Sequence, residues 1–316
     1  MKKIISKGVE RHLRWALAAL MSVALLGADR PHAKEASQVH ESSRPTSGDS
    51  KALAVSQPQS AVVASNFTKA LFTRLKPLIV GMSPNQVVAF LAYRFLKTPY
   101  QAYSLDAGGL EQLRIDLTHF DCMLFVEQLL AIATAPSSWD DFVNVTRQLR
   151  YDKGEVSYCS RHHYFYHWAQ SAESNGLLID LTPQFTSHRR RKITLNYMST
   201  HPRAYRPLRN PETFRCIRDR ERNYQVIQSY VPNASLHQVS AQLKSGDLFA
   251  VATSVPGLDV THMGTIVREG SSVSAIHAIP GQGVIRSVSF ARYVASVPQS
   301  IGAVILRPRP SVRHDQ

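Results

Sequence analysis

The pattern of apolar and polar positions predicts helices in the first half of the chain. Asn66 to Leu75 and Ser83 to Phe95 carry apolar residues at helical spacing. Cys122 to Ala135 repeats this spacing most strongly, and Asp121 just before it is a good N-cap residue. Cys122 is therefore expected in the first turn of a helix.

The middle of the chain has a mixed pattern. Leu113 to Leu117 alternates apolar and polar residues like a short strand. Asp140 to Arg150 and the aromatic-rich Tyr164 to Ser174 have helical spacing, and Gly154 to Ser160 indicates a turn and a strand between them.

From Ser245 onward the chain consists of β-rich runs separated by Gly, Pro and Ser. The runs are Asp247 to Thr253, Val260 to Val267, Val273 to Ile279 and Gly302 to Arg307. Short runs of this kind favour an antiparallel sheet. Helices first and strands last predict an α+β domain in which the two classes are segregated.

The N-terminal segment is typical of an exported protein. A Lys/Arg-rich start precedes an apolar run of about 14 residues, whereas a membrane-spanning helix needs roughly 20. Residues 1–28 are therefore predicted to be a signal peptide, cleaved after Ala28 or Ala33. Residues 29–65 are rich in Ser, Ala, Pro, Gln and His and are expected to form a flexible linker. Residues 66–316 are then expected to form a single domain without a membrane anchor, located in the periplasm or secreted.

Net charge changes the expected partners. The formal charge of +14 and a pI near 9.9 favour anionic partners. No nucleic-acid-binding motif accompanies the charge. An exported protein would instead meet phosphate-rich lipids, anionic polymers and peptidoglycan, so an anionic envelope surface is the expected partner. The densest basic run, His188 to Lys192, is expected in a solvated loop.

The chain has three cysteines, Cys122, Cys159 and Cys216. An odd number in an oxidising compartment leaves at least one thiol outside any disulfide. Cys159 and Cys216 are expected either to pair or to be buried as free thiols. Both arrangements keep Cys122 available for chemistry.

Cys122 is the candidate nucleophile. The thiolate is the reactive form, and a helix N-terminus beside an imidazolium lowers the thiol pKa. His262, on a predicted strand next to Gly264, is the candidate base. If Glu269-Gly270 forms the hairpin turn, His277 lies directly opposite His262 and can orient it, which completes a triad.

Six segments carry a resemblance to a known family. They are Phe120 to Glu127, Ser160 to Phe165 with Trp168, Asn196 to Ser199 with Tyr205, Gly246 to Leu248, Pro256 to Gly264 and Ile276 to Ala278. The chain thereby resembles, over about Leu91 to Leu306, the N-acetylmuramoyl-L-alanine amidase-like family of the NlpC-type (papain-like) cysteine peptidase superfamily.

The resemblance implies a papain-like fold whose nucleophile-bearing helix packs on a C-terminal antiparallel sheet. It implies Cys122 as nucleophile, His262 as base and His277 as orienting residue, with backbone N–H groups at the helix start stabilising the oxyanion. Tyr100 matches a position where relatives contact the substrate. The implied activity is cleavage of an amide in peptidoglycan or muropeptides, of the N-acetylmuramoyl-L-alanine amidase type, without a metal or another cofactor.

Two further residues are candidates for substrate contact. Arg161 can bind a carboxylate of a peptide stem through its bidentate fork, or form a structural salt bridge. His163 belongs to a histidine cluster that is expected on a helix surface or in the substrate groove.

Other functions stay open. His162, His163 and His167 offer a weak zinc-ligand pattern, although no carboxylate neighbours them. Within cysteine chemistry, the alternatives are a stem-peptide endopeptidase and an acyltransferase or lipid-directed hydrolase. A non-catalytic envelope-binding module is the remaining possibility.

Overall fold

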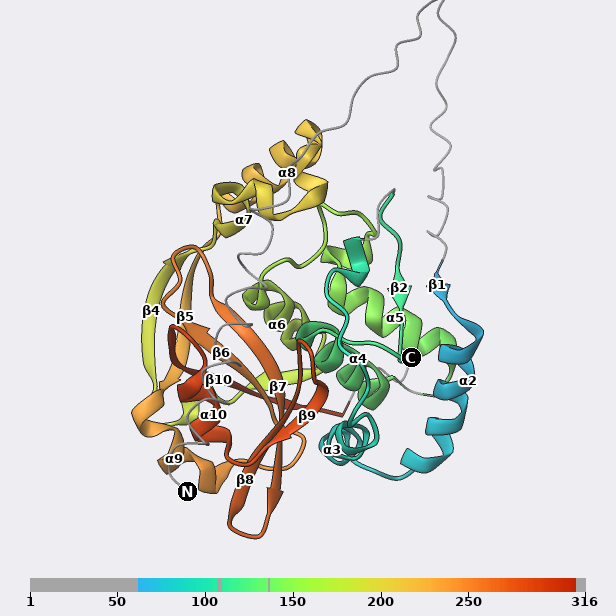
Figure 1. Cartoon of the computed structure of the whole chain (residues 1–316), viewed down its shortest axis with the longest axis vertical. Coiled ribbons are helices and arrows are strands. Elements are labelled where there is room, and N and C mark those ends of the chain that lie inside the picture. Colours follow the sequence, from blue (N-terminus) through green and yellow to red (C-terminus); the bar gives the residue numbers. More distant parts are fainter. Residues whose placement is uncertain (1–61, 107–109, 136, 311–316) are drawn as a thin grey trace, which may run out of the picture.

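The computed structural model describes residues 62–106, 110–135 and 137–310. In these residues, helices α2 to α6 gather on one side of the molecule and a large sheet lies on the other, with α7 and α8 at one end (Figure 1). The helices are α2 (Asn66–Leu75), α3 (Pro84–Arg94), α4 (Cys122–Thr134), α5 (Trp139–Arg150), α6 (Phe165–Ser174), α7 (Tyr197–Thr200), α8 (Pro211–Glu221), α9 (Leu236–Val239) and α10 (Phe290–Ser296).

The large sheet has eight strands in the order β4-β5-β10-β6-β7-β8-β9, with β3 also paired to β10. Every pairing within it is antiparallel. The strands are β3 (Leu178–Asp180), β4 (Arg189–Thr194), β5 (Gln225–Pro232), β6 (Leu248–Thr253), β7 (Val260–Glu269), β8 (Ser272–Ile279), β9 (Gly283–Ser287) and β10 (Ser300–Pro308). The α+β class with a large antiparallel sheet is confirmed.

The sheet is covered on both faces because alternate residues of its strands point to opposite sides. Leu248, Ala250 and Met263 face the core built with α3 and α4. Phe249 and Ile266 face a second core, to which α9 and α10 contribute. All six residues of β6 are buried, as expected for a central strand covered on both sides.

Helix α4 lies at the centre of the molecule. The Asp121 carboxylate caps it by accepting a hydrogen bond from the Leu124 N–H at 2.7 Å. Two turns on, the buried Glu127 carboxylate accepts a hydrogen bond from the Arg150 guanidinium at 3.0 Å, which joins α4 to α5. This network fixes the helix that carries Cys122.

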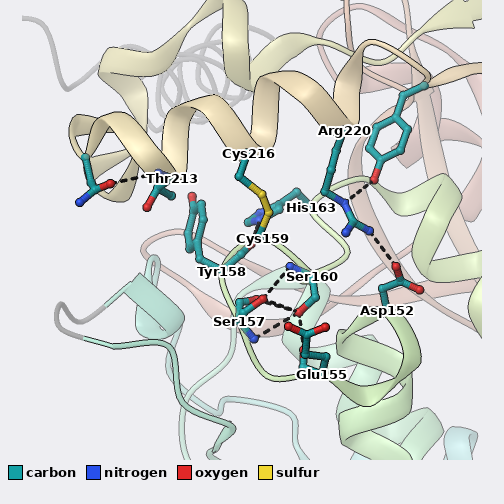
Figure 2. Close-up of a disulfide and its surroundings, with 12 residues drawn as sticks. Asp152, Glu155, Ser157, Tyr158, Cys159, Ser160, His163, Thr213, Cys216 and Arg220 are labelled. Atoms are coloured by element: carbon teal, nitrogen blue, oxygen red, sulfur yellow. Dashed lines mark hydrogen bonds and ion pairs between the residues drawn. A yellow bond between two sulfur atoms is a disulfide. The ribbon is translucent and has the colours of Figure 1, made fainter. Parts of the chain in front are cut away.

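A disulfide between Cys159 and Cys216 joins α8 to the loop before α6 (Figure 2). Their Cα atoms are 6.1 Å apart. Figure 2 also shows Arg220 of α8 in an ion pair with Asp152, at 2.9 Å. Of the two expected arrangements of these cysteines, the structure contains the pair and leaves Cys122 free.

Three local predictions are corrected. The linker was expected to reach residue 65, but Val63–Ala64 forms β1, which pairs in parallel with β2 (Arg114–Ile115). No strand lies within 154–160, where a 3-10 turn and side-chain hydrogen bonds between Ser157 and Ser160 shape the chain. The basic run is a strand rather than a loop, because β4 is stabilised by pairing along its whole length with β5.

The predicted signal peptide and nearly all of the predicted linker lie outside the described residues. Among the residues that the structure describes, no helix is long and apolar enough to cross a membrane.

Candidate active site

Cys122 occupies the first turn of α4, as predicted. Hydrogen bonds from the backbone N–H groups of Met263, Cys122 and Met123 favour its thiolate, but burial has the larger effect and, with the Asp121 charge, raises the pKa of the thiol to about 12. The helix start therefore favours the thiolate, as predicted, but burial outweighs this effect in the free protein. Met263 directly follows His262, so its N–H links the nucleophile to the candidate base strand.

His262 and His277 form a hydrogen bond, with 3.1 Å between His262 Nε2 and His277 Nδ1. His277 is fully buried. Burial lowers the pKa of His262 to about 4 and holds that of His277 well below its usual value. Both imidazoles are consequently neutral near pH 7.

The register of the hairpin differs from the predicted one. Glu269 pairs with Ser272, so the turn is at Gly270-Ser271, and Thr265 pairs with Ile276. The two histidines are therefore diagonal rather than directly opposite, and residues at diagonal positions on one sheet face are still within side-chain reach.

Gly264 allows the two strands that carry His262 and His277 to lie close together. The register places His277 beside it, and a Cβ there would come within 2.7 Å of both the Ile276 carbonyl oxygen and the Phe249 ring. The absence of a side chain lets the two strands and the ring lie this close.

Two residues that the sequence analysis missed contact His277. Ser287, the last residue of β9, lies 2.8 Å through its Oγ from His277 Nε2. Tyr293 of α10 stacks on the His277 ring with centroids 4.0 Å apart and meets His262 edge-on at 5.8 Å. The β-branched pair Val284-Ile285 after the Pro280-Gly281 turn is the sequence signal that indicates β9.

Tyr100 lies beside Cys122, the candidate nucleophile. It forms a parallel β-bridge with Phe120, and its pKa is raised by burial and then by the charges of Cys122 and Asp121. The preceding loop is anchored to β9, because the Val284 N–H donates to the Thr98 carbonyl at 2.9 Å. The structure thus brings Tyr100 to the end of α4 that carries Cys122.

Arg161 and His163 lie instead beside the disulfide. The Arg161 guanidinium binds both oxygens of Glu111, at 3.0 and 2.6 Å, and Asp106 at 2.8 Å. Of its two expected roles, the structure contains the salt bridge, and this occupies the fork. The His163 ring hydrogen-bonds through Nε2 to the Tyr158 carbonyl at 2.7 Å, and burial lowers its pKa to about 3.

The histidine cluster does not form a metal centre in the described part of the chain, where no group of three or more His, Cys, Asp or Glu side chains could hold a metal ion. His162 and His167 line a small cavity with Cys159, and their Nε2 atoms are buried without a hydrogen-bond partner. Burial lowers the pKa of each to about 4.

The arrangement is suited to nucleophilic acyl chemistry. A thiol at a helix start, an imidazole on the adjacent strand and a second imidazole hydrogen-bonded to the first provide a nucleophile, a base and an orienting group. Backbone N–H groups at the start of α4 are positioned donors for a developing oxyanion.

Comparison with known proteins finds one matching family model. Residues 90–302 match the model described as AmiA-like, N-acetylmuramoyl-L-alanine amidase-like. The search of curated protein sequences finds no match.

Solved structures of similar fold are also found. Two of them are crystal structures of an N-acetylmuramoyl-L-alanine amidase from Bacteroides uniformis ATCC 8492, with TM-scores of 0.68 and 0.67 and sequence identities of 29% and 30%. Each match covers 72% of this chain and 99% of the amidase chain. A candidate xylanase from Bacteroides fragilis has a TM-score of 0.64 and 32% identity, and covers 68% of this chain and 98% of its own.

Proposed function

The chain belongs to the AmiA-like family of N-acetylmuramoyl-L-alanine amidase-like proteins, and from this premise we propose that it is an exported cysteine hydrolase that cleaves an amide bond in peptidoglycan or muropeptides. The bond proposed is the one between N-acetylmuramic acid and L-alanine, which is the specificity named for the Bacteroides uniformis structures. The fold proposed is the papain-like arrangement of the NlpC-type superfamily.

The hydrogen bond between His262 and His277 carries the proposal. It engages His262 Nε2, so Nδ1 is the nitrogen that can accept a proton when Nε2 donates this bond. The Met263 N–H, one residue further along β7, points to the sulfur of Cys122. His262, the proposed base, and Met263, whose N–H contacts the Cys122 sulfur, are therefore neighbouring residues of β7.

The reaction follows from the protonation states. Because burial keeps both the thiol and the imidazole neutral, the Cys122 proton passes to His262 Nδ1 as the sulfur attacks the amide carbon. Backbone N–H groups at the start of α4 stabilise the resulting oxyanion. His262 then protonates the leaving amine, and the same imidazole activates water to hydrolyse the thioester.

A glycosidase function has less support at this site. Glycoside hydrolysis generally uses two carboxyl groups that flank the scissile bond. Around Cys122 the structure gathers a thiol, two imidazoles and phenols, and the Asp121 carboxylate is already engaged as the helix cap. These groups favour acyl transfer.

The proposed location is the periplasm or the exterior. The predicted signal peptide supports export, and the Cys159–Cys216 disulfide is typical of an oxidising compartment. The proposed substrate is the anionic wall polymer or its fragments, which suits a chain of net charge +14.

The test is digestion of muropeptides of defined stem length by the purified mature protein, with Cys122→Ala as the control and mass spectrometry of the products. Release of intact stem peptide by the wild type alone would support the amidase function. Cleaved stem fragments would indicate an endopeptidase, and products transferred to added amines would indicate an acyltransferase. Absence of any cleavage would contradict the hydrolase proposal and favour an envelope-binding module.

A further inference from the structure

The hydrogen-bonded chain from His262 through His277 to Ser287 can carry its protons in two orders. A neutral imidazole has one N–H donor and one acceptor nitrogen. If the Ser287 hydroxyl donates to His277 Nε2, then His277 Nδ1 carries the proton and donates to His262 Nε2. If Ser287 accepts, every bond in the chain is reversed.

The two orders differ at the nitrogen that matters for catalysis. In the first order, His262 Nε2 accepts a hydrogen bond, so its Nδ1 carries the proton and cannot take another from Cys122. In the second order, His262 Nε2–H donates to His277, and Nδ1 has a free lone pair. Only the second order gives a base.

We propose that Ser287 is a positioning residue that fixes this second order by accepting a hydrogen bond from His277 Nε2–H. The inference rests on the proposed function and deepens it, because it adds Ser287 as a third member of the relay behind Cys122. When the thiol proton moves to His262 Nδ1, no other proton has to move. The new imidazolium keeps donating to His277, and His277 keeps donating to Ser287.

The geometry around His277 supports this role. The His277 ring is fully buried, so an Nε2–H without an acceptor would carry the desolvation penalty of an unpaired polar group. Ser287 meets it at 2.8 Å. Ala275 pairs with Ser287 and His277 with Ile285, which places the serine diagonally from the histidine across adjacent strands.

The charged neighbours leave this bond undisturbed. Arg286, next to Ser287 on β9, points its guanidinium to Glu269, at 2.8 and 2.7 Å. From α10, Tyr293 covers the face of the His277 ring, and Cys122 of α4 is near enough to Tyr293 for its charge, after burial, to raise the pKa of that phenol. The hydroxyl of Ser287 is thus the acceptor that the structure offers to His277 Nε2.

The experiment compares Ser287→Val with Ser287→Thr, which have the same shape but differ in the hydroxyl group. The tautomer of His277 is read by ¹⁵N NMR of the full mature protein, and Cys122 is titrated by its rate of alkylation with iodoacetamide against pH. In the wild type and Ser287→Thr we expect His277 to be protonated at Nε2. In Ser287→Val we expect the proton to move to Nδ1, and alkylation at pH 7 to slow about 10-fold, equivalent to a rise of one unit in the apparent thiol pKa.

A wild-type His277 protonated at Nδ1 would overturn the proposal, and this reading requires no variant to fold. An unchanged tautomer and unchanged alkylation in Ser287→Val would overturn it as well. Neither measurement uses a cell-wall substrate. A wild-type protein with the expected tautomer that cleaves no muropeptide would therefore contradict the hydrolase function and leave the role of Ser287 in place.

Discussion

Burial sets the chemistry of the individual groups around Cys122. The thiol pKa rises from 9.0 to about 12, a shift that corresponds to roughly 4 kcal/mol against the thiolate. A helix N-terminus typically contributes only ~0.3–1 kcal/mol in the other direction. Desolvation therefore has the larger effect in the free protein, and Cys122, the proposed nucleophile, is a neutral thiol that would need a base to react.

Tyr293 is expected to keep that base in place. Its ring stacks on His277 and meets His262 edge-on, so it fixes both imidazoles and keeps water away from them. Tyr293→Leu should lower kcat/KM on a cleaved muropeptide by on the order of 10-fold or more, because small displacements of catalytic groups are costly. Kinetics beside thermal unfolding would measure this.

Tyr293→Phe is the matched control, since it keeps the ring and removes the hydroxyl group. It should retain activity within about 3-fold if stacking is what positions His277. Equal losses in the two variants would assign the effect to the hydroxyl group instead.

At the level of elements, strand β4 shows how a basic run can be a structured part of a sheet. Side chains alternate along it, so Arg190 points to solvent while Arg191 is directed inward. Arg191 binds Gln228 Oε1 at 2.8 and 2.6 Å and donates to the carbonyls of Thr253 and Asp259. The inward arginine thereby connects the edge strand to the turn that precedes β7.

Arg191→Gln should therefore destabilise the protein, whereas Arg190→Gln should not. We expect the first substitution to lower the free energy of unfolding by about 2–3 kcal/mol, because it removes charge-assisted bonds to the buried Gln228 and to two carbonyls. The second should change it by less than ~0.5 kcal/mol. Urea unfolding would measure both, and similar values for the pair would show that the inward contacts contribute little.

For the whole molecule, five partly or fully buried histidines predict sensitivity to acid. The pKa is lowered to about 4 for His162, His167 and His262, to about 3 for His163, and well below the usual value for His277. Between pH 6.5 and 4 the unfolded chain therefore binds more protons than the folded chain at these sites, and stability falls as pH falls through this window.

Buried carboxyl groups act in the opposite direction. The pKa of Asp121 is raised to about 6, and those of Asp180 and Asp259 are raised as well, so the folded chain holds protons there that the unfolded chain has lost. The five imidazoles that destabilise the fold as pH falls are more numerous than the three carboxyl groups that stabilise it. We therefore expect a net loss of stability from pH 6.5 to 4. Urea unfolding at several pH values would measure it, and stability that is constant or rises over this range would contradict the prediction.

His167→Phe provides the specific check. The phenyl ring can keep the contact with Tyr224, whose ring centroid lies 3.8 Å from that of His167, and the Nε2 that is lost has no hydrogen-bond partner. Between pH 6.5 and 4, the unfolded chain should then bind about one proton fewer in excess of the folded chain, so the free energy of unfolding should depend less steeply on pH.

The elements with strong local patterns could be predicted from the sequence alone. Helix α4, its Asp121 cap and the position of Cys122 follow from apolar spacing and from a side chain that caps its own helix, both of which act within a few residues. The runs that became β6, β7, β8 and β10 were equally clear, because central strands are apolar along their length.

The way in which these elements meet could not be predicted from the sequence, because it is set in the folded chain. The basic strand β4 is stable through its pairing with β5, and the hairpin register depends on which residues form the turn. Ser287 and Tyr293 reach His277 from elements that follow it in the chain, and the shifts of the pKa values depend on burial by the whole fold. These properties arise from contacts between distant segments, whereas periodicity along the chain reports only on neighbours.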